Sequence, residues 1–493
     1  LSSAASDVYK RQAQMRTFNN FIWRFAQTEG NYNFSSGSRG KGNLSSEANP
    51  YFLFPQIYNF RYNIFSSEWP VANRVIELYL QKKSENGGWE RQINGISNNE
   101  KAVLLLEKRT FKELLVDMEL RNLQNNIVGQ EASRLFARAE INMGVEAFRD
   151  SLYSLLKRNT FLNIKFENML DTLGEISRTD IRSLLGEWEK TTPLPFYSLG
   201  EPTLTKITNK GGEEFFVLKM LISNNSDYDG IIHMDIRKDG WWYQPLEDPR
   251  AKTKIEMPAH TSKEFVSVWE DQIRNVEINT MVSGNLPNII SQDINNVKQE
   301  RNKIVKDSIY ILPESSFDLP GEIIVDNEDS TLFILSAPPI VGLLPKWLDE
   351  VEETPFKYSG ISWWRPPLQW TATTNDRYYG KYIRSAFVIK SGDGSQTATW
   401  KVPVPEVGQY DLYYHVFKDD ELRWNNNLQG EYHFKVKYGS EVEDAYVNLR
   451  KANEGWEQLG SYYFDSDTIR VVLTDECKLR SVTADAVKIV KRY

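Results

Sequence analysis

Residues 455–487 hold four short segments that decide how the end of this chain folds: Gly455-Trp456, Leu459-Gly460-Ser461-Tyr462-Tyr463-Phe464, Ile469-Arg470-Val471-Val472-Leu473 and Ala484-Asp485-Ala486-Val487. Short apolar runs of this kind, separated by turn residues, are typical of β-strands in a sandwich. The segments therefore predict an all-β module at the end of the chain.

Upstream segments extend this pattern with strict alternation of apolar and polar residues. Their apolar members are Leu412, Tyr414, Val416, Tyr432, Phe434, Val436 and Tyr438. Alternation with a period of two places one face of a strand against a core and the other toward solvent. We therefore predict a β-sandwich over residues 356–493.

The module resembles the carbohydrate-binding-domain-like module found at the end of golvesin and of xanthan lyases. Besides the opening segments, the resemblance rests on Trp370, on Trp400 with Val402-Pro403, on Gly408-Gln409-Tyr410 and on Tyr432. It implies a jelly-roll-like β-sandwich, a polysaccharide or cell-envelope glycan as partner, and an extracellular, periplasmic or cell-surface location.

Most residues of the motif are expected to build the scaffold. Asp485, between two alanines, can accept hydrogen bonds from backbone N–H groups or a hydroxyl and so fix the chain end. The predicted structural residues are Trp400, Gly408, Tyr432, Trp456, Leu459, Gly460, Asp485 and Val487.

Candidate ligand contacts lie instead in loop-like, polar surroundings. Sugars bind where an aromatic face meets apolar C–H groups and a few polar side chains fix the hydroxyls. The candidates are Trp363, Trp364, Arg365, Tyr378, Tyr379, Tyr382 and Trp424. For each aromatic residue, packing inside the module is the open alternative.

Upstream of the module, the period of the apolar residues changes along the chain. Leu104, Phe111, Leu115 and Met118 are predicted to share one helical face, as are Phe148, Leu152, Leu155 and Leu156. Thr179 is predicted to cap a helix that carries Ile181, Leu184, Leu185 and Trp188. Strand patterns follow, with Phe215 to Ile222 as one run and Ile232, Met234 and Ile236 as another.

These periods predict a multidomain α+β chain, in which a helical block precedes a small β-sandwich and the C-terminal one. Residues 1–12 resemble a translated sequencing adapter, so we expect a C-terminal fragment of a longer protein and leave these residues out of fold reasoning. The predicted regions are 13–66 (irregular), 67–195 (α-helical), 196–292 (β-sandwich), 293–355 (linker with short strands) and 356–493 (C-terminal β-sandwich). Within the linker, Asn296 to Lys306 is predicted as linker or short helix.

The composition argues against some classes of partner and some structural features. The net charge of −8 argues against nucleic acid. Cys477 is the only cysteine, which excludes an internal disulfide, and no apolar run is long enough to span a membrane.

The sequence offers no catalytic or metal-binding residues that we can name. The four histidines, His233, His260, His415 and His433, are too far apart for an H-E-x-x-H zinc helix, and each lies within or beside a β-type segment. Cys477 is interpreted as an incidental thiol, since nothing nearby would lower its pKa. No cofactor is expected in this chain.

A second, more diffuse resemblance covers residues 51–290, which are similar to the C-terminal half of bacterial zinc aminopeptidase-like (gluzincin) proteins. It rests on Asn94-Gly95, Asn99-Glu100-Lys101-Ala102, Gly144, Phe148, Trp188 and Asn285-Leu286-Pro287, among others. It implies that zinc and its ligands belong to the upstream part of the parent protein. We expect a non-catalytic region with a terminal glycan-binding-like module; the alternatives are part of a zinc aminopeptidase or, more weakly, an accessory part of a polysaccharide lyase.

Overall fold

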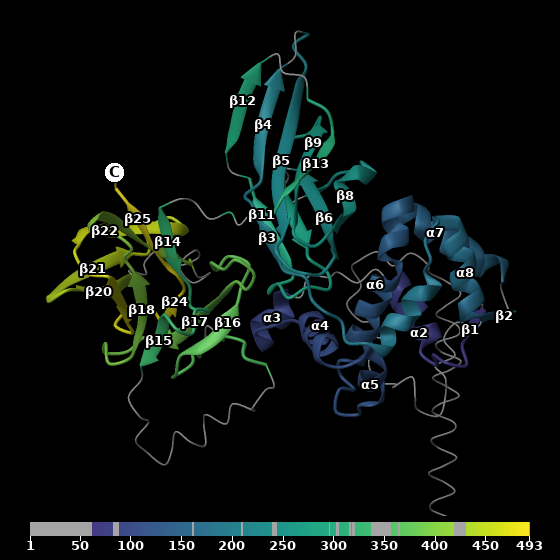
Figure 1. Ribbon diagram of the computed structural model, residues 1–493, viewed down its shortest axis with the longest axis horizontal. Helices are drawn as coiled ribbons and strands as arrows, with labels where there is room; N and C mark the ends of the chain where they lie inside the picture. The colour runs from purple at the N-terminus through teal and green to yellow at the C-terminus, as the bar shows by residue number, and fades with distance from the viewer. Residues whose placement is uncertain are drawn as a thin grey trace, which may run out of the picture.

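The computed structural model describes residues 62–81, 88–159, 162–208, 211–238, 244–294, 296–301, 305–314, 317, 321–336, 356–362, 365–418 and 430–492. A helical region comes first along the chain, a pair of sheets follows, and a second group of sheets ends it (Figure 1). The fold class is therefore the predicted one, a multidomain α+β chain. Among the described residues, no helix is long and apolar enough to cross a membrane.

The helical region is built around a cluster of buried aromatic rings, in which Trp188 contacts Phe111 and Phe166. The predicted stripe Phe148, Leu152, Leu155 and Leu156 is confirmed, since all four side chains are buried. The helices are α2 (Ala72–Leu80), α3 (Gly88–Asn94), α4 (Asn98–Lys108), α5 (Phe111–Val116), α6 (Gln124–Met143), α7 (Val145–Arg158), α8 (Phe166–Ser177) and the 3-10 helix η1 (Arg182–Glu189).

The predicted helical face from Leu104 to Met118 is wrong, because one helix, α4, ends at Lys108 and a separate helix, α5, begins at Phe111. Thr110 accepts a hydrogen bond from the backbone N–H of Glu113, whose side chain accepts one from the backbone N–H of Thr110. This capping box starts a new helix. The new helix also ends before Met118, whose side chain is exposed.

Two further details of the helical region differ from the prediction. Thr179 caps no helix; η1 begins after Ile181, and the Asp180 carboxylate accepts a hydrogen bond from the backbone N–H of Ser183 instead. The predicted all-α block also contains a strand, β2 (Leu162–Lys165), which pairs in parallel with β1 (Tyr62–Phe65). The irregular segment predicted up to residue 66 otherwise lies outside the described residues.

The middle region consists of two sheets whose inner faces share one apolar core. The alternation of Ile232, Met234 and Ile236 is confirmed, because all three are fully buried on one strand. One sheet contains β6 (Gly230–Lys238), β7 (Gln244–Pro245), β8 (Lys252–Met257), β10 (Ile273–Asn279) and β11 (Ile289–Asp293). The other contains β3 (Tyr197–Leu199), β4 (Thr203–Thr208), β5 (Glu214–Asn224), β9 (Thr261–Trp269), β12 (Val297–Arg301) and β13 (Ser308–Pro313).

The prediction of a linker or short helix at Asn296 to Lys306 is wrong, because β12 lies within it. This strand pairs in parallel with β4, and β13 pairs antiparallel with β9. The second middle sheet therefore continues past residue 292.

The C-terminal region forms two larger sheets that enclose a common core, with a smaller sheet beside them. The alternations at residues 412–416 and 432–438 are confirmed by burial of the apolar members. The first sheet has the order β14 (Glu322–Val325), β25 (Val487–Lys491), β19 (Gly408–Val416) and β22 (Gly455–Phe464). The second has the order β15 (Phe333–Ser336), β18 (Thr397–Pro403), β23 (Thr468–Thr474), β20 (Glu431–Tyr438) and β21 (Glu441–Asn448). The smaller sheet consists of β16 (Thr371–Thr374), β17 (Ser385–Lys390) and β24 (Ser481–Ala484).

Two strands of the predicted linker contribute to these C-terminal sheets. β14 pairs with β25, and β15 pairs with β18. Their residues Val325 and Phe333 are buried in the core of the module. The sandwich thus draws on chain upstream of residue 356, while the domain limits themselves stay a prediction.

Candidate functional site

One group of buried polar contacts in the C-terminal module is centred on Asp485, in the short connection between β24 and β25. Its carboxylate is fully buried and accepts hydrogen bonds from the backbone N–H of Tyr379 at 3.2 Å. His415 Nδ1 lies 2.8 Å from the Asp485 Oδ2 atom. Burial raises the pKa of Asp485, whereas His415 and Arg384 act in the opposite direction. These are the contacts that an anchor of the chain end requires; the role itself stays a prediction.

The main chain around Asp485 is held by aromatic residues of the core. Trp400 is fully buried, and its Nε1–H donates to the carbonyl oxygen of Asp485 at 3.2 Å. The hydroxyl of Tyr432 accepts a hydrogen bond from the backbone N–H of Thr483 at 3.0 Å. Val487 is fully buried as well. Leu459 is partly buried against the same core, and Gly408 and Gly460 lie on the paired strands β19 and β22.

A second acidic group approaches Asp485 from the loop between β14 and β15. Burial is the main reason that the pKa of Asp326 lies well above its usual value, and the nearby charge of Asp485 adds to the shift. Glu328 accepts hydrogen bonds from Tyr358 and Ser385 and forms a salt bridge with Lys357. The loop between β14 and β15, in the stretch predicted as linker, therefore places the Asp326 carboxyl group near Asp485.

The predicted ligand residues do not form one surface among the described residues. Tyr378 is buried against Phe417, with ring centroids 4.6 Å apart, which is the packing arrangement left open for each aromatic candidate. Tyr382 packs against Phe196 of the middle region. Arg365 is exposed. Trp363, Trp364 and Trp424 lie outside the described residues.

Tyr379, a predicted ligand residue, and Trp456, a predicted structural residue, lie side by side in the structure. Their ring centroids are 5.0 Å apart, and both rings contact the His415 imidazole. The Lys488 ammonium lies 4.9 Å from the Trp456 ring centroid. Both aromatic side chains are half-buried. This cluster joins Asp485 to the surface of the β14-β25-β19-β22 sheet.

Sequence reasoning missed an exposed aromatic residue on the other large sheet. The side chain of Tyr446, on β21, is 57% exposed. Its ring lies parallel to the His433 ring, with an interplanar angle of 8° and centroids 4.8 Å apart. The two residues face each other across the β20–β21 hairpin. The signal was the alternation along residues 441–448, which places Tyr446 outward because Ala445 and Val447 are buried.

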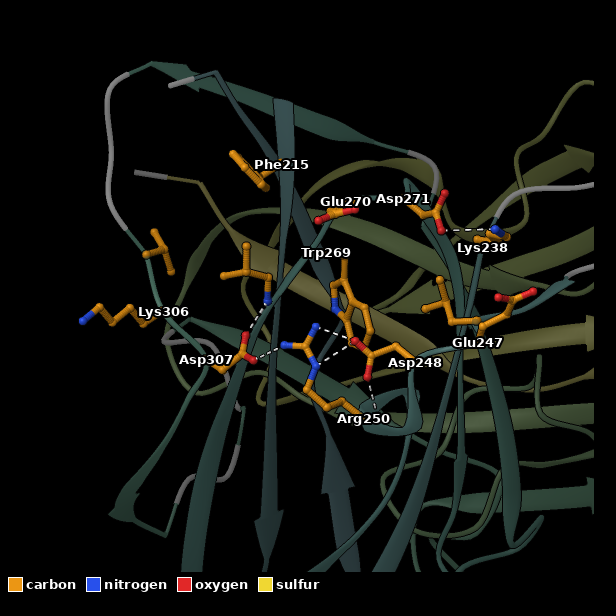
Figure 2. Close-up of a pocket in the computed structure, with 13 residues that line it drawn as sticks. Phe215, Lys238, Glu247, Asp248, Arg250, Trp269, Glu270, Asp271, Lys306 and Asp307 are labelled. Carbon is orange, nitrogen blue, oxygen red and sulfur yellow. Dashed lines mark hydrogen bonds and ion pairs between the residues drawn. The ribbon is translucent and has the colours of Figure 1, made fainter. Parts of the chain in front are cut away.

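A pocket of about 670 Å³ lies in the middle region and was not predicted (Figure 2). Trp269 forms part of its wall, and the Arg250 guanidinium lies 5.0 Å from the centroid of the Trp269 ring. The other lining residues are Phe215, Lys238, Leu246, Glu247, Asp248, Val268, Glu270, Asp271, Val305, Lys306 and Asp307. They come from distant stretches of the chain, so no local motif reveals the pocket.

The charged side chains of the pocket are largely paired with one another. Arg250 forms salt bridges with Asp248 and with Asp307, and its guanidinium lowers the pKa of Asp248. Lys238 pairs with Asp271 at 3.1 Å. The Arg250–Asp307 pair connects the 3-10 helix η2 (Pro249–Ala251) to the segment before β13. Paired charges of this kind hold the strands and loops around the pocket in place.

The comparisons with known proteins concern mainly the C-terminal module. Residues 366–491 match the family model described as Golvesin C-terminal domain. The match supports the resemblance to the end of golvesin that the sequence indicated for this module. The resemblance of residues 51–290 to zinc aminopeptidases gains no support from the comparisons. A search of curated proteins finds no match.

Solved structures similar to this chain include a Bacteroides uniformis β-glucuronidase, with 11% identity over 62% of this chain and 31% of that chain, at a TM-score of 0.17. Another is the exo-β-1,3-galactanase of Phanerochaete chrysosporium, with 8% identity over 59% of this chain and 69% of that chain, at a TM-score of 0.20. This chain spans only 31% of the length of the β-glucuronidase. Such TM-scores are too low to assign a fold or a function.

Proposed function

We propose that the chain is a non-catalytic region of a secreted or cell-surface protein, and that its C-terminal module binds a polysaccharide. The match of residues 366–491 to the Golvesin C-terminal domain carries this proposal. Modules of carbohydrate-binding type hold a larger protein at its substrate or at the cell envelope. Such tethering raises the local concentration of the attached domains without new contacts.

The aromatic residues of the module support the same function. An exposed aromatic face can stack on the C–H groups of a sugar, and neighbouring polar groups can fix its hydroxyls. Tyr446 offers such a face, with Asp444 beside it on the same strand. Trp363 and Trp364 stay candidates for a second contact, next to the exposed Arg365.

Affinity electrophoresis of the complete chain against a panel of neutral and acidic polysaccharides tests the proposal. We expect at least one polysaccharide to retard the protein, and we expect Trp363→Ala combined with Trp364→Ala to weaken the retardation. Tyr153→Ala is a matched control, because Tyr153 is an exposed aromatic residue on α7 of the helical region. Absence of retardation by every polysaccharide would show that the module is structural.

The unfolding transition of each variant separates loss of a contact from loss of the fold. If Trp363 and Trp364 contact a ligand, their replacement changes retardation while the urea midpoint stays near that of the original chain. If the two residues belong to a core, truncation to Ala costs about 3–5 kcal/mol each and lowers the midpoint strongly.

A further inference from the structure

We infer that the outer face of the β15-β18-β23-β20-β21 sheet binds an acidic polysaccharide through a row of three cations, Lys401, Arg470 and Lys437. This inference rests on the proposed function, because it names the class of glycan that the module would take. The strand register places the three residues side by side. Lys401 lies opposite Arg470 in the β18–β23 pair, and Lys437 lies opposite Arg470 in the β20–β23 pair.

All three side chains leave the sheet on the face away from the core. The residues beside them along the strands, such as Val402, Ile469 and Val436, are fully buried in the core. Successive side chains of a strand point to opposite faces, so the cations point outward. Arg470 and Lys437 are exposed, and Lys401 is half-buried.

The cationic row is uncompensated within the part of the chain that the structure describes. No described carboxylate forms a salt bridge with Lys401, Arg470 or Lys437. Like charges directly opposite each other destabilise a sheet, since their Cβ atoms are only about 4.5–5.5 Å apart. Some other cations of the module do have a carboxylate partner, as Lys488 has in Glu322 at 3.0 Å. A bound anion that bridges the row would remove this repulsion.

The same face carries further groups that suit an extended acidic glycan. Lys435 is the next outward residue on β20, one step of roughly 6.6 Å from Lys437. One step further lies His433, against which the exposed ring of Tyr446 is stacked. Asp444 is held by His433, 2.7 Å from its Nε2 atom. The face thus offers cations at one end and an aromatic surface at the other.

An acidic sugar polymer matches the cationic end of this face through its charges. At the aromatic end, where the carboxylates of Asp444 and Glu476 lie beside His433, it would present uncharged parts of its rings. Its carboxylate or sulfate groups fit the cations, and the C–H groups of its rings fit the face of Tyr446. A nucleic acid also carries anions and stacking rings, but it would have to approach a chain whose net charge is −8. The observations therefore favour the polysaccharide over a nucleic acid.

Binding of the complete chain to polygalacturonate, with dextran as the neutral polymer, tests the inference. We expect polygalacturonate to bind in a salt-sensitive way and the triple variant K401Q/R470Q/K437Q to bind at least about tenfold more weakly. The control K390Q/R450Q/K451Q removes the same number of charges from other exposed positions of the module, and it should stay within about twofold of the original chain. Arg470 lies at the centre of the row, so polygalacturonate binding of the single variant Arg470→Gln provides a second test if the triple variant folds poorly.

The outcomes distinguish this inference from the proposed function. If the original chain binds a neutral polysaccharide but not polygalacturonate, or if the row variant binds polygalacturonate as well as the original chain does, the inference is overturned and the proposed function stands. Equal losses in the row variant and in the control would show that only overall charge matters, and would overturn the inference too. Stronger binding to single-stranded DNA or to phosphatidylglycerol vesicles would assign the row to a different partner. If no polysaccharide binds, the proposed function itself is refuted.

Discussion

The strands β14 and β15 should be essential to the C-terminal module, although they lie upstream of its predicted start. A fragment of residues 356–493 lacks both strands, and with them the buried side chains of Val325 and Phe333. Burial of an apolar side chain of this size contributes about 1.5–3 kcal/mol. The two losses together remove about 3–6 kcal/mol, which is a large share of the roughly 5–15 kcal/mol that stabilises a domain.

Urea unfolding of two fragments, followed by tryptophan fluorescence, measures this contribution. We expect residues 316–493 to unfold in one cooperative transition. Residues 356–493 should unfold at a much lower urea concentration or show no transition at all. Loss of β14 and β15 also exposes the backbone edges of β25 and β18, so the shorter fragment should aggregate more readily.

Two single substitutions on β15 provide a matched control in the complete chain. The Phe333 side chain is 8% exposed and the neighbouring Ile334 side chain is 42% exposed, on the opposite face of the strand. Phe333→Ala should cost about 3–5 kcal/mol, and Ile334→Ala should stay within about 0.5 kcal/mol. Equal unfolding midpoints for the two fragments, or equal costs for the two substitutions, would refute the assignment of β15 to the core.

Two other predictions concern stability. Burial and the charge of Asp485 raise the pKa of Asp326 in the folded protein well above its ordinary value of 3.8. The folded state is therefore stabilised by keeping this proton, and that stabilisation is lost as the pH rises through the folded-state pKa. Asp326→Asn cannot ionise, so its urea midpoint relative to the original chain should increase from pH 4.5 to pH 8; a difference that is independent of pH would contradict the shift. In the helical region, Thr110→Ala should lower the free energy of unfolding by about 1 kcal/mol, because it removes the cap of α5. Thr110→Ser keeps a capping hydroxyl and should retain most of this stability. Equal thermal unfolding of the two variants would show that the cap is unimportant.

Strands with strict alternation were predictable from the sequence. The run from Tyr432 to Tyr438 forms β20 with its apolar members buried, as does the run from Ile232 to Ile236 in β6. In both, the difference in burial between the two faces is large, so the side-chain pattern alone specifies the strand. The stripe of α7 was predictable for the same reason, at the helical period.

Elements that depend on backbone pairing or capping were not predictable in this way. β12 contains Lys298, Glu300 and Arg301 and has no apolar alternation, yet its backbone pairs with β4. Helical periodicity also runs past Arg109, and only the capping box at Thr110 ends one helix and starts the next. Main-chain pairing decides the structure of β12, and hydrogen bonds between side chains and the main chain decide where α5 begins.

Surfaces assembled from distant segments were the hardest to predict. Lys401, Arg470 and Lys437 are far apart in the sequence and become neighbours only through the register of β18, β23 and β20. The pocket near Trp269 likewise combines residues from β5, the segment around η2 and the approach to β13. Sequence patterns report which face of a strand is buried, but they do not report which strand lies beside it.

The position of the module relative to the rest of the chain follows from a junction where all three regions meet, near α3, α4 and β16 (Figure 1). Glu100, fully buried, accepts a hydrogen bond from the backbone N–H of Asn288 at 2.9 Å, which ties the helical region to the middle sheets. The Thr374 hydroxyl donates to the carbonyl oxygen of Gly95 at 2.6 Å, which ties the module to the helices. Gly95 has a φ of +81°, and a Cβ there would lie 2.4 Å from the backbone nitrogen of Ser359, so glycine is required for this close approach.

Such direct contacts fix the orientation of the module, whereas a flexible linker would let it rotate. A polysaccharide held by the outer face of the module would therefore run in one constant direction relative to the helical region.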